Sequence, residues 1–164
     1  MKIQELILLL ATVCAALMAG LFYSYSFSVN LGLSKLTDLE YLKAMQSINR
    51  EIQNPIFFLC FFGVLIFLPA SAFCYVTHRK VFICLLCAAC TYFTGVFGVT
   101  VLGNVPLNDQ LEAFDLVQAN ATSLQQQRGL FESRWNTLNH VRTASSLLTV
   151  LLLTCACLWT HAEE

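Results

Sequence analysis

Three residues near the last apolar run of the sequence fall on one face of a helix. Trp135, Asn139 and Arg142 are spaced i, i+4 and i+7, which places them on one side of an α-helix. Arg142 begins an uncharged run that extends to Glu163. A charge at this depth either faces the interior of a bundle or extends to the lipid head groups. In the interior, its guanidinium could donate hydrogen bonds to an anionic or enolic oxygen. At the head groups, Trp135 would be an ordinary interfacial residue.

His140 lies next to this face, about 100 degrees away around the helix. Imidazole exchanges protons near neutral pH, so this side chain is a candidate base. The alternative is an interfacial histidine, which is the more common situation at a membrane boundary.

A second group of polar residues lies between the first two apolar runs, in residues 36–53. Apolar residues recur there at helical spacing and predict an amphipathic helix; they are Leu36, Leu39, Leu42, Met45, Ile48 and Ile52. Gln46, Asn49 and Gln53 form a polar stripe beside them, at i, i+3 and i+7. The stripe is either a solvated face of a surface helix or one wall of a site.

Sequence signals mark both ends of this predicted helix. Thr37 and Glu40 form a T-x-x-E capping box at its start. Asn54-Pro55 ends it, because the residue before a proline avoids the helical region.

The second long segment begins with Gly103-Asn104-Val105-Pro106-Leu107-Asn108. Glycine and proline predict a break at the end of the third apolar run. Asn108 is then expected to cap a new helix that reaches Val117. Ser123 and Gln126 form another capping box, for a helix that continues into the fourth apolar run.

Tyr23 and Tyr25 lie in a polar and aromatic stretch, residues 22–28, near the end of the first apolar run. Tyrosines at this depth can line a ligand cavity. They can equally be interfacial belt residues or helix contacts.

Four apolar runs have to position these candidate residues. Of the 164 residues, 57% are hydrophobic and 12% are charged, about half the share of charge in an average globular domain. Stretches of about 20 uncharged residues can cross a bilayer as helices; they predict transmembrane helices at 4–31, 55–77, 81–103 and 138–160. The expected fold is all-α. It is a single domain, 1–164, built as a four-transmembrane-helix bundle with two amphipathic helical excursions on one membrane side.

Charge and cysteine placement limit the partners and cofactors. A net charge of −1 provides no basic surface for nucleic acid, so membrane lipids are the expected surroundings.

All eight cysteines fall in the apolar runs, and no loop disulfide is expected. Cys84, Cys87 and Cys90 have metal-like spacing, but no histidine accompanies them and no metal site is predicted. Without a Rossmann or P-loop motif, no nucleotide cofactor is predicted. The oligomeric state is left open.

The link between the second and third runs, His78-Arg79-Lys80, is short and basic. The positive-inside rule places this link, and with it both termini, on the cytoplasmic side. Lys35, Lys43 and Arg50 lie in the segment between the first two runs, and a simple count of positive charges would place that segment on the cytoplasmic side instead. Asn120-Ala-Thr122 is a glycosylation pattern that would suit an outward-facing second loop.

Four pieces of the sequence together carry a family resemblance; they are Tyr23 to Ser28 followed by Leu31-Gly32-Leu33, Met45 to Asn49 followed by Asn54-Pro55, Gly103 to Asn108, and Arg134-Trp135 followed by Asn139 to Thr143. In this order they resemble the anthrone oxygenase-like family of small four-span membrane proteins. The resemblance covers nearly the whole chain, and its specific parts are the Asn-Val-Pro-Leu-Asn stretch and the Trp-to-Arg helix. Where the family often has Met-Pro, this chain has Asn30-Leu31, which affects the wall near the first run.

The resemblance implies oxidation of an anthrone, a reduced tricyclic aromatic ketone, to an anthraquinone with O₂ and no added cofactor. The central methylene must lose a proton to give an enolate that reacts with oxygen. A base, an anion-stabilising group and an aromatic clamp are therefore required. Arg142 is assigned to the anion and His140 to the base. Orienting donors and a clamp complete the expected site; the donors are Asn49, Asn104, Asn108 and Asn139 with Gln46 beside them, and the clamp is Trp135, Tyr23 and Tyr25.

Two other classes of protein stay open. One is a non-enzymatic membrane scaffold or binder of lipids or hydrophobic ligands. The other is a transporter, which the absence of acidic residues within the runs disfavours. An enzyme is expected to gather five polar residues around one cavity, whereas a scaffold would scatter them over the surface; they are Asn49, Asn104, Asn108, Asn139 and Arg142.

Overall fold

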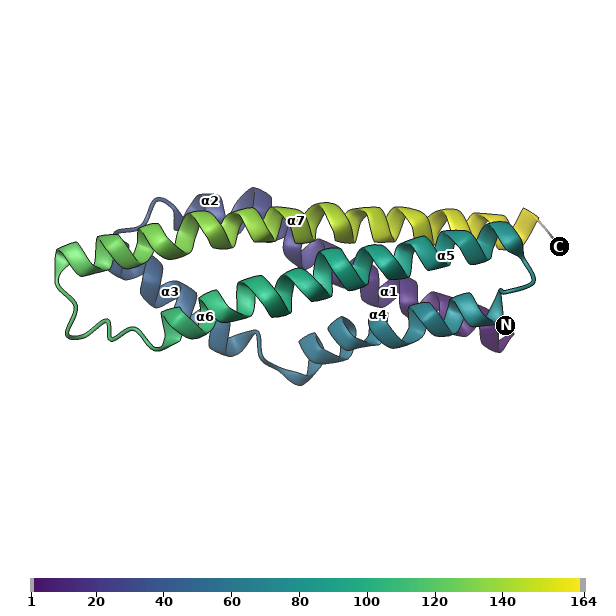
Figure 1. Ribbon diagram of the computed structural model, residues 1–164, viewed down its shortest axis with the longest axis horizontal. Helices are drawn as coiled ribbons and strands as arrows, with labels where there is room; N and C mark the ends of the chain where they lie inside the picture. The colour runs from purple at the N-terminus through teal and green to yellow at the C-terminus, as the bar shows by residue number, and fades with distance from the viewer. Residues whose placement is uncertain (1, 163–164) are drawn as a thin grey trace.

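A computed structural model describes residues 2–162, and all regular elements in this part of the chain are helices (Figure 1). Four long helices form the bundle, and a shorter helix, α3 (Asp38–Glu51), lies between the first two in sequence. The long helices have the following parts: α1 (Ile3–Ser24), the π-helical segment η1 (Tyr25–Val29) and α2 (Asn30–Leu33) in the first; α4 (Pro55–Cys74) in the second; α5 (Arg79–Tyr92), the π-helical segments η2 (Phe93–Gly98) and η3 (Thr100–Asn104) and α6 (Val105–Glu112) in the third; and α7 (Ala121–Ala162) in the fourth.

All four long helices are apolar enough to cross a membrane; the stretches are Ile3–Leu33, Pro55–Cys74, Arg79–Glu112 and Ala121–Thr160. This confirms the all-α, four-span prediction that rested on the uncharged runs. α7 alone has 42 residues, which corresponds to about 63 Å at 1.5 Å per residue. A hydrocarbon core is only about 30 Å thick, so the bundle extends well beyond the apolar layer.

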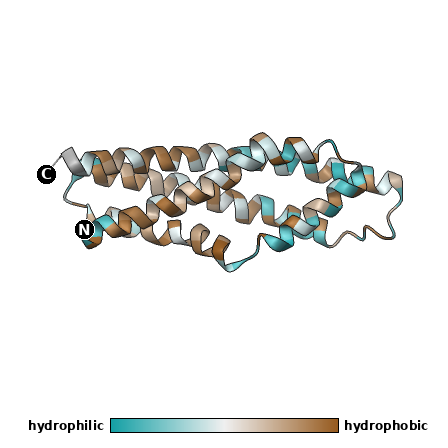
Figure 2. Ribbon diagram, turned by 180° about the vertical axis from the view of Figure 1, so that it is seen from behind, coloured by the Kyte–Doolittle hydropathy of each residue, from teal (hydrophilic) through white to brown (hydrophobic). Residues whose placement is uncertain are grey.

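The two ends of the bundle differ in composition. Both ends of the described chain and the link between α4 and α5 lie together, while α2, α3, α6 and the start of α7 lie at the opposite end (Figure 1). The first of these ends is mainly hydrophobic, and the second carries most of the hydrophilic residues (Figure 2). One buried apolar cluster joins the four long helices, and a second lies beneath α3. The hydrophobic half therefore serves as the membrane anchor, and the polar half is where a site can form.

α3 begins at the predicted capping box. The backbone N–H of Thr37 donates to Glu40 Oε2 at 3.0 Å, and the backbone N–H of Glu40 donates to Thr37 Oγ1 at 3.4 Å. The buried apolar face of α3 packs on α6 and α7; its members are Tyr41, Leu42 and Met45. Asn54 begins α4, because its Oδ1 accepts from the backbone N–H of Phe57 at 3.0 Å.

Polar contacts fasten α3 to the third long helix. Gln46 Nε2 donates to the carbonyl oxygens of Leu111 at 2.8 Å and Phe114 at 3.1 Å. Arg50 forms an ion pair with Glu112 at 2.7 Å. Buried hydrogen bonds such as those of Gln46 cost more to break than exposed ion pairs. The Gln46 hydrogen bonds therefore hold α3 on the third long helix more strongly than the Arg50–Glu112 ion pair does.

The predicted break after the third apolar run is wrong. The helix continues through Gly103 and Pro106 to Glu112. Proline lacks an N–H and its ring crowds the preceding turn, and the wide π-helical turns of η3, directly before Pro106, leave room for it. Asn108 therefore lies inside a helix and does not cap one, and α6 ends before Phe114. Within the described residues, α3 is the one separate helix found where two excursions were expected.

α7 is continuous from its start to the hydrophobic end of the bundle, as the sequence indicated. Its first residue is Ala121, because Asn120 Oδ1 accepts from the backbone N–H of Ser123 at 2.9 Å. Asn120 therefore takes the capping position that was assigned to Ser123. The fourth long helix includes both the expected extramembrane segment and the span.

Candidate functional site

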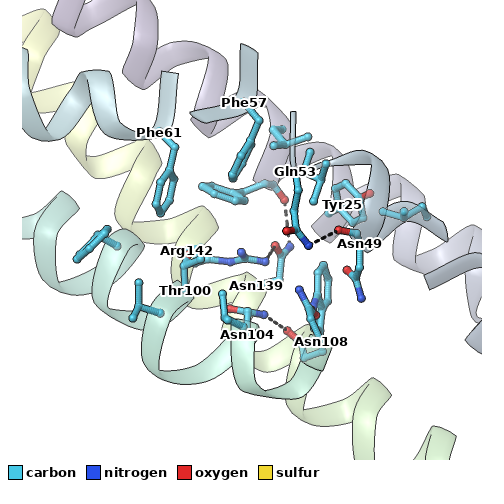
Figure 3. A pocket seen from close by; sticks show the side chains of 18 of the residues that line it. Tyr25, Asn49, Gln53, Phe57, Phe61, Thr100, Asn104, Asn108, Asn139 and Arg142 are labelled. Atoms are coloured by element: carbon cyan, nitrogen blue, oxygen red, sulfur yellow. Dashed lines mark hydrogen bonds between the residues drawn. The ribbon is translucent and has the colours of Figure 1, made fainter. Parts of the chain in front are cut away.

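A cavity of about 260 Å³ lies where α3 covers the bundle (Figure 3). This volume is close to the lower end of the roughly 300–1,000 Å³ that small-molecule pockets span. All four long helices and α3 contribute to its wall. Its polar lining consists of Tyr25, Asn49, Gln53, Thr100, Asn104, Asn108, Asp109, Asn139 and Arg142.

Arg142 lies inside the bundle and not at the head groups. Its exposed fraction is 6%, and its Nη2 donates to Asn139 Oδ1 at 2.8 Å. The guanidinium carbon lies 4.6 Å from the ring centre of Phe22 and 5.3 Å from that of Trp135, within the range of cation–π attraction. In the described part of the chain no carboxylate forms an ion pair with Arg142. The pocket thus contains a buried positive charge that aromatic rings and amides surround.

Asn139 has its amide fixed in one orientation. Its Nδ2 donates to the carbonyl oxygen of Phe22 at 3.2 Å and to Ser26 Oγ at 2.9 Å. Ser26 Oγ also lies 2.8 Å from Thr143 Oγ1. Because both donor positions of the amide are engaged, its oxygen points to Arg142. Asn139 therefore positions the guanidinium and links α7 to the first long helix.

The third long helix contributes two asparagines one turn apart. Asn104, only 1% exposed, donates weakly to the carbonyl oxygen of Trp135 at 3.5 Å. Asn108 Oδ1 accepts from Trp135 Nε1 at 2.9 Å. Thr100, Asn104 and Asn108 share one helix face by their i, i+4 spacing. The π-helical segment η3 holds the first two of these residues, in keeping with the frequent use of such segments at functional sites.

Three buried polar atoms of the pocket have no hydrogen-bond partner in the protein. They are Arg142 Nε, Asn49 Nδ2 and Asn104 Oδ1. Unpaired buried polar groups are uncommon in native proteins, and each costs about 1–3 kcal/mol. Two donors and one acceptor without partners therefore belong to residues that line the same cavity, and a polar group of a ligand could satisfy them.

Aromatic rings form two walls of the pocket. The Tyr25 and Trp135 rings lie 5.6 Å apart on one side. The Phe57 and Phe61 rings are stacked 5.3 Å apart on α4. Figure 3 shows these phenylalanines on the side of the pocket opposite Asn108, with Arg142 between them. A flat apolar ligand would meet rings on both faces.

The pocket opens sideways, between α4 and the third long helix. Four apolar residues of its lining are at the same time exposed on the outer surface; they are Phe58, Phe62, Val101 and Val105. All four belong to the helices that are long and apolar enough to cross a membrane. The opening is therefore apolar, while the amides lie further inside.

Three of the expected site residues lie outside this pocket. Gln46 is turned away and binds the backbone of the third long helix. Tyr23 is half exposed and packs on Phe27 at 4.8 Å. His140 is exposed on the outer face of α7, 6.3 Å from Phe27. One helix position corresponds to about 100 degrees, which is enough to turn His140 away from the pocket that Asn139 faces.

The other seven expected residues line the pocket together; they are Tyr25, Asn49, Asn104, Asn108, Trp135, Asn139 and Arg142. The pocket is also lined by Phe22, Phe61, Thr100 and Asp109, for which no role was predicted from the sequence. Thr100 and Asp109 were missed because the third span was expected to end at residue 103. A continuous helix would have placed them beside Asn104 and Asn108.

Four apolar helices and an amide-lined aromatic pocket define a small multi-pass membrane protein with an internal pocket. The family model named anthrone oxygenase matches residues 57–152, more than half of the chain and most of the pocket. The chain therefore belongs to the anthrone oxygenase family, as its sequence motifs indicated. No match to the chain was found among curated proteins or among solved structures.

Proposed function

We propose that this protein oxidises an apolar polycyclic phenolic substrate, such as an anthrone, to a quinone with O₂. The observation that carries the proposal is the buried guanidinium of Arg142, which lies beside an aromatic wall, has no ion-pair partner among the described residues and has an Nε without a hydrogen bond. An enolate oxygen is an anion attached to a flat apolar ring system, and it requires this combination of surroundings. The five polar residues whose gathering would distinguish an enzyme from a scaffold all line one pocket.

The proposed reaction begins when the central methylene of the substrate loses a proton. The C–H electron pair enters the ring system, and the carbonyl becomes an enolate oxygen that Arg142 stabilises. O₂ then adds at the carbanionic carbon and takes up a proton to give a hydroperoxide. Loss of water from this group leaves the second carbonyl. Overall, the CH₂ group and O₂ become C=O and H₂O, so oxygen is reduced and the carbon is oxidised.

The residues of this chain have distinct parts in the proposal. Arg142 Nε and Asn49 Nδ2 donate to the substrate oxygens, and Asn104 Oδ1 accepts from a substrate hydroxyl. Asn139 positions the guanidinium. Trp135 and Phe61 contact the faces of the rings. The sideways apolar opening supports entry of the substrate from the bilayer.

The test is conversion of an anthrone by the purified protein in lipid nanodiscs. We expect quinone absorbance to rise with one O₂ consumed per quinone formed, at a rate above that of nanodiscs with an Arg142→Gln variant. The alternative of a non-enzymatic binder predicts that the anthrone raises the melting temperature of the wild type without faster quinone formation.

We further propose that the site end of the bundle faces away from the cytoplasm. The short basic link between α4 and α5 lies at the same end as both ends of the described chain (Figure 1), which supports a cytoplasmic position for that end. Single cysteines placed at Lys80 and at Gln118, in a variant without native cysteines, would test this. Labelling of the Gln118 position from the cytoplasmic side would contradict the orientation.

A further inference from the structure

The proposed reaction needs a proton acceptor, and the expected one does not reach the pocket. His140 is exposed on the outer face of α7, so it cannot contact a substrate held beside Arg142. Among the described residues that line the cavity, the titratable side chains are Tyr25, Asp109 and Arg142. Arg142 is already a cation, and a neutral phenol such as Tyr25 is a poor proton acceptor. Asp109 is the single carboxylate of the lining.

We propose that Asp109 is the catalytic base that removes the methylene proton; this inference rests on the proposed function. Asp109 is part of α6 and follows Asn108 directly. Among residues 2–162 no ion pair engages its carboxylate and no hydrogen bond of its carboxylate oxygens is seen, so both oxygens can accept a proton. The residue is also exposed at the surface, so a proton taken from the substrate has a route out of the pocket.

Arg142 and Asp109 line the cavity from two different helices, α7 and α6. In an anthrone, the carbonyl carbon and the methylene carbon are opposite each other in the central ring. A substrate that is held in the cavity with its oxygen at Arg142 therefore has to present its methylene to the side of the cavity that α6 forms, and Asp109 is the carboxylate on that side.

The step that the inference assigns to Asp109 is a simple proton transfer. A carboxylate oxygen of Asp109 forms a bond to the proton as the methylene C–H bond breaks. The electron pair of that bond becomes the new double bond of the enolate, and the carbonyl electrons move to the oxygen beside Arg142. No oxidant is needed until O₂ enters, so proton transfer can be measured without oxygen.

The experiment follows hydrogen–deuterium exchange at the methylene of an anthrone in D₂O without O₂, with protein in nanodiscs. We expect the wild type to accelerate exchange and Asp109→Asn to reduce the protein-dependent rate at least a hundred-fold, a typical contribution of a positioned base. The same variant should still show the rise in melting temperature that the anthraquinone product causes. Glu51→Gln is the matched control, because it removes a carboxylate of α3 that does not line the pocket, and it should exchange as the wild type does.

A second variant distinguishes the loss of a base from a merely structural effect of the substitution. Asp109→Ala should be inactive alone and should recover exchange when acetate or formate is added, since the residue is exposed at the surface. Exchange by Asp109→Asn within about threefold of the wild type would overturn the role of Asp109 and leave the oxidation proposal intact if the wild type still forms quinone. A wild type that neither exchanges nor forms quinone would remove the oxidation proposal, and this inference with it.

Discussion

The amide oxygen of Asn139 accepts a hydrogen bond from Arg142 Nη2 at 2.8 Å, while its nitrogen donates to the first long helix. The amide cannot turn over without losing all of these bonds. The guanidinium therefore has a fixed place in the pocket, and its Nε remains without a partner in the protein. A buried cation that is positioned but unpaired favours a ligand that carries an anionic or strongly polarised oxygen.

The first prediction concerns Arg142→Lys, which keeps the positive charge but removes the planar set of donors. Loss of one charge-assisted hydrogen bond costs about 1.5–3 kcal/mol, so we expect kcat/KM for anthrone oxidation to fall by roughly ten- to a hundred-fold. Quinone formation and melting temperature should be measured in parallel. A loss of melting temperature with unchanged turnover would contradict a role in catalysis and favour a structural network.

The second prediction concerns Asn139→Ala. Its removal leaves Arg142 Nη2 and the hydroxyl of Ser26 short of buried partners, and each such loss costs about 1–3 kcal/mol. We expect both a lower melting temperature and weaker product binding, because the guanidinium is no longer held in place. Thr137→Ala, on the exposed side of α7, is the control. An Asn139→Ala protein with normal product affinity would show that the amide does not position Arg142.

The third prediction concerns close packing between the third and fourth long helices. A Cβ added at Gly95 would lie 2.6 Å from Ser145 Cβ and closer still to its Oγ, whereas one added at Gly129 meets nothing within 4 Å. We expect Gly95→Ala to lower stability by about 1–3 kcal/mol, a typical cost of overpacking. Gly129→Ala should be neutral or stabilising by about 0.5–1 kcal/mol, because alanine favours a helix interior.

Thermal unfolding in detergent would measure both glycine variants. The double change Gly95→Ala with Ser145→Gly should recover most of the lost stability if the contact is the cause. A single Gly95→Ala variant as stable as the wild type would mean that the two helices can separate slightly without cost.

The fourth prediction concerns the pH dependence of α3. Hydrogen bonds from Thr37 hold the pKa of the Glu40 carboxyl below its ordinary value. A carboxyl with a lowered folded-state pKa stabilises the fold when ionised, and this contribution is lost as pH falls through that pKa. We expect backbone hydrogen exchange at the start of α3, corrected for intrinsic rates, to increase on acidification below about pH 4. Glu40→Gln should show no such step, and an equal step in that variant would contradict the assignment.

The fold was largely predictable because uncharged runs of about 20 residues allow few structures other than helices in a membrane. The third span was predicted too short, because Gly103 and Pro106 normally interrupt a helix. The wide turns of η3 compensate for the proline here, and a local sequence rule does not anticipate them. This error also hid Thr100 and Asp109 from the predicted site.

The candidate site was predictable where simple helix periodicity holds. Trp135, Asn139 and Arg142 share a face, as their spacing required, and all three line the pocket. Tyr23 and Tyr25 are two residues apart and therefore lie about 200 degrees apart around the helix, so both could not face one pocket, and periodicity alone did not decide which of them does. The sequence also left open whether Arg142 points inward, since that depends on packing against Phe22 of another helix.

The sideways opening between α4 and the third long helix determines which concentration of ligand the pocket responds to. A pocket that opens on an apolar face meets molecules dissolved in the bilayer, so the relevant concentration is moles of ligand per mole of lipid. An apolar substrate partitions strongly into that phase. An apparent KM in micromolar units should therefore rise as more lipid is added to an assay, while the turnover number stays constant, and the ratio of substrate to lipid is the quantity to report.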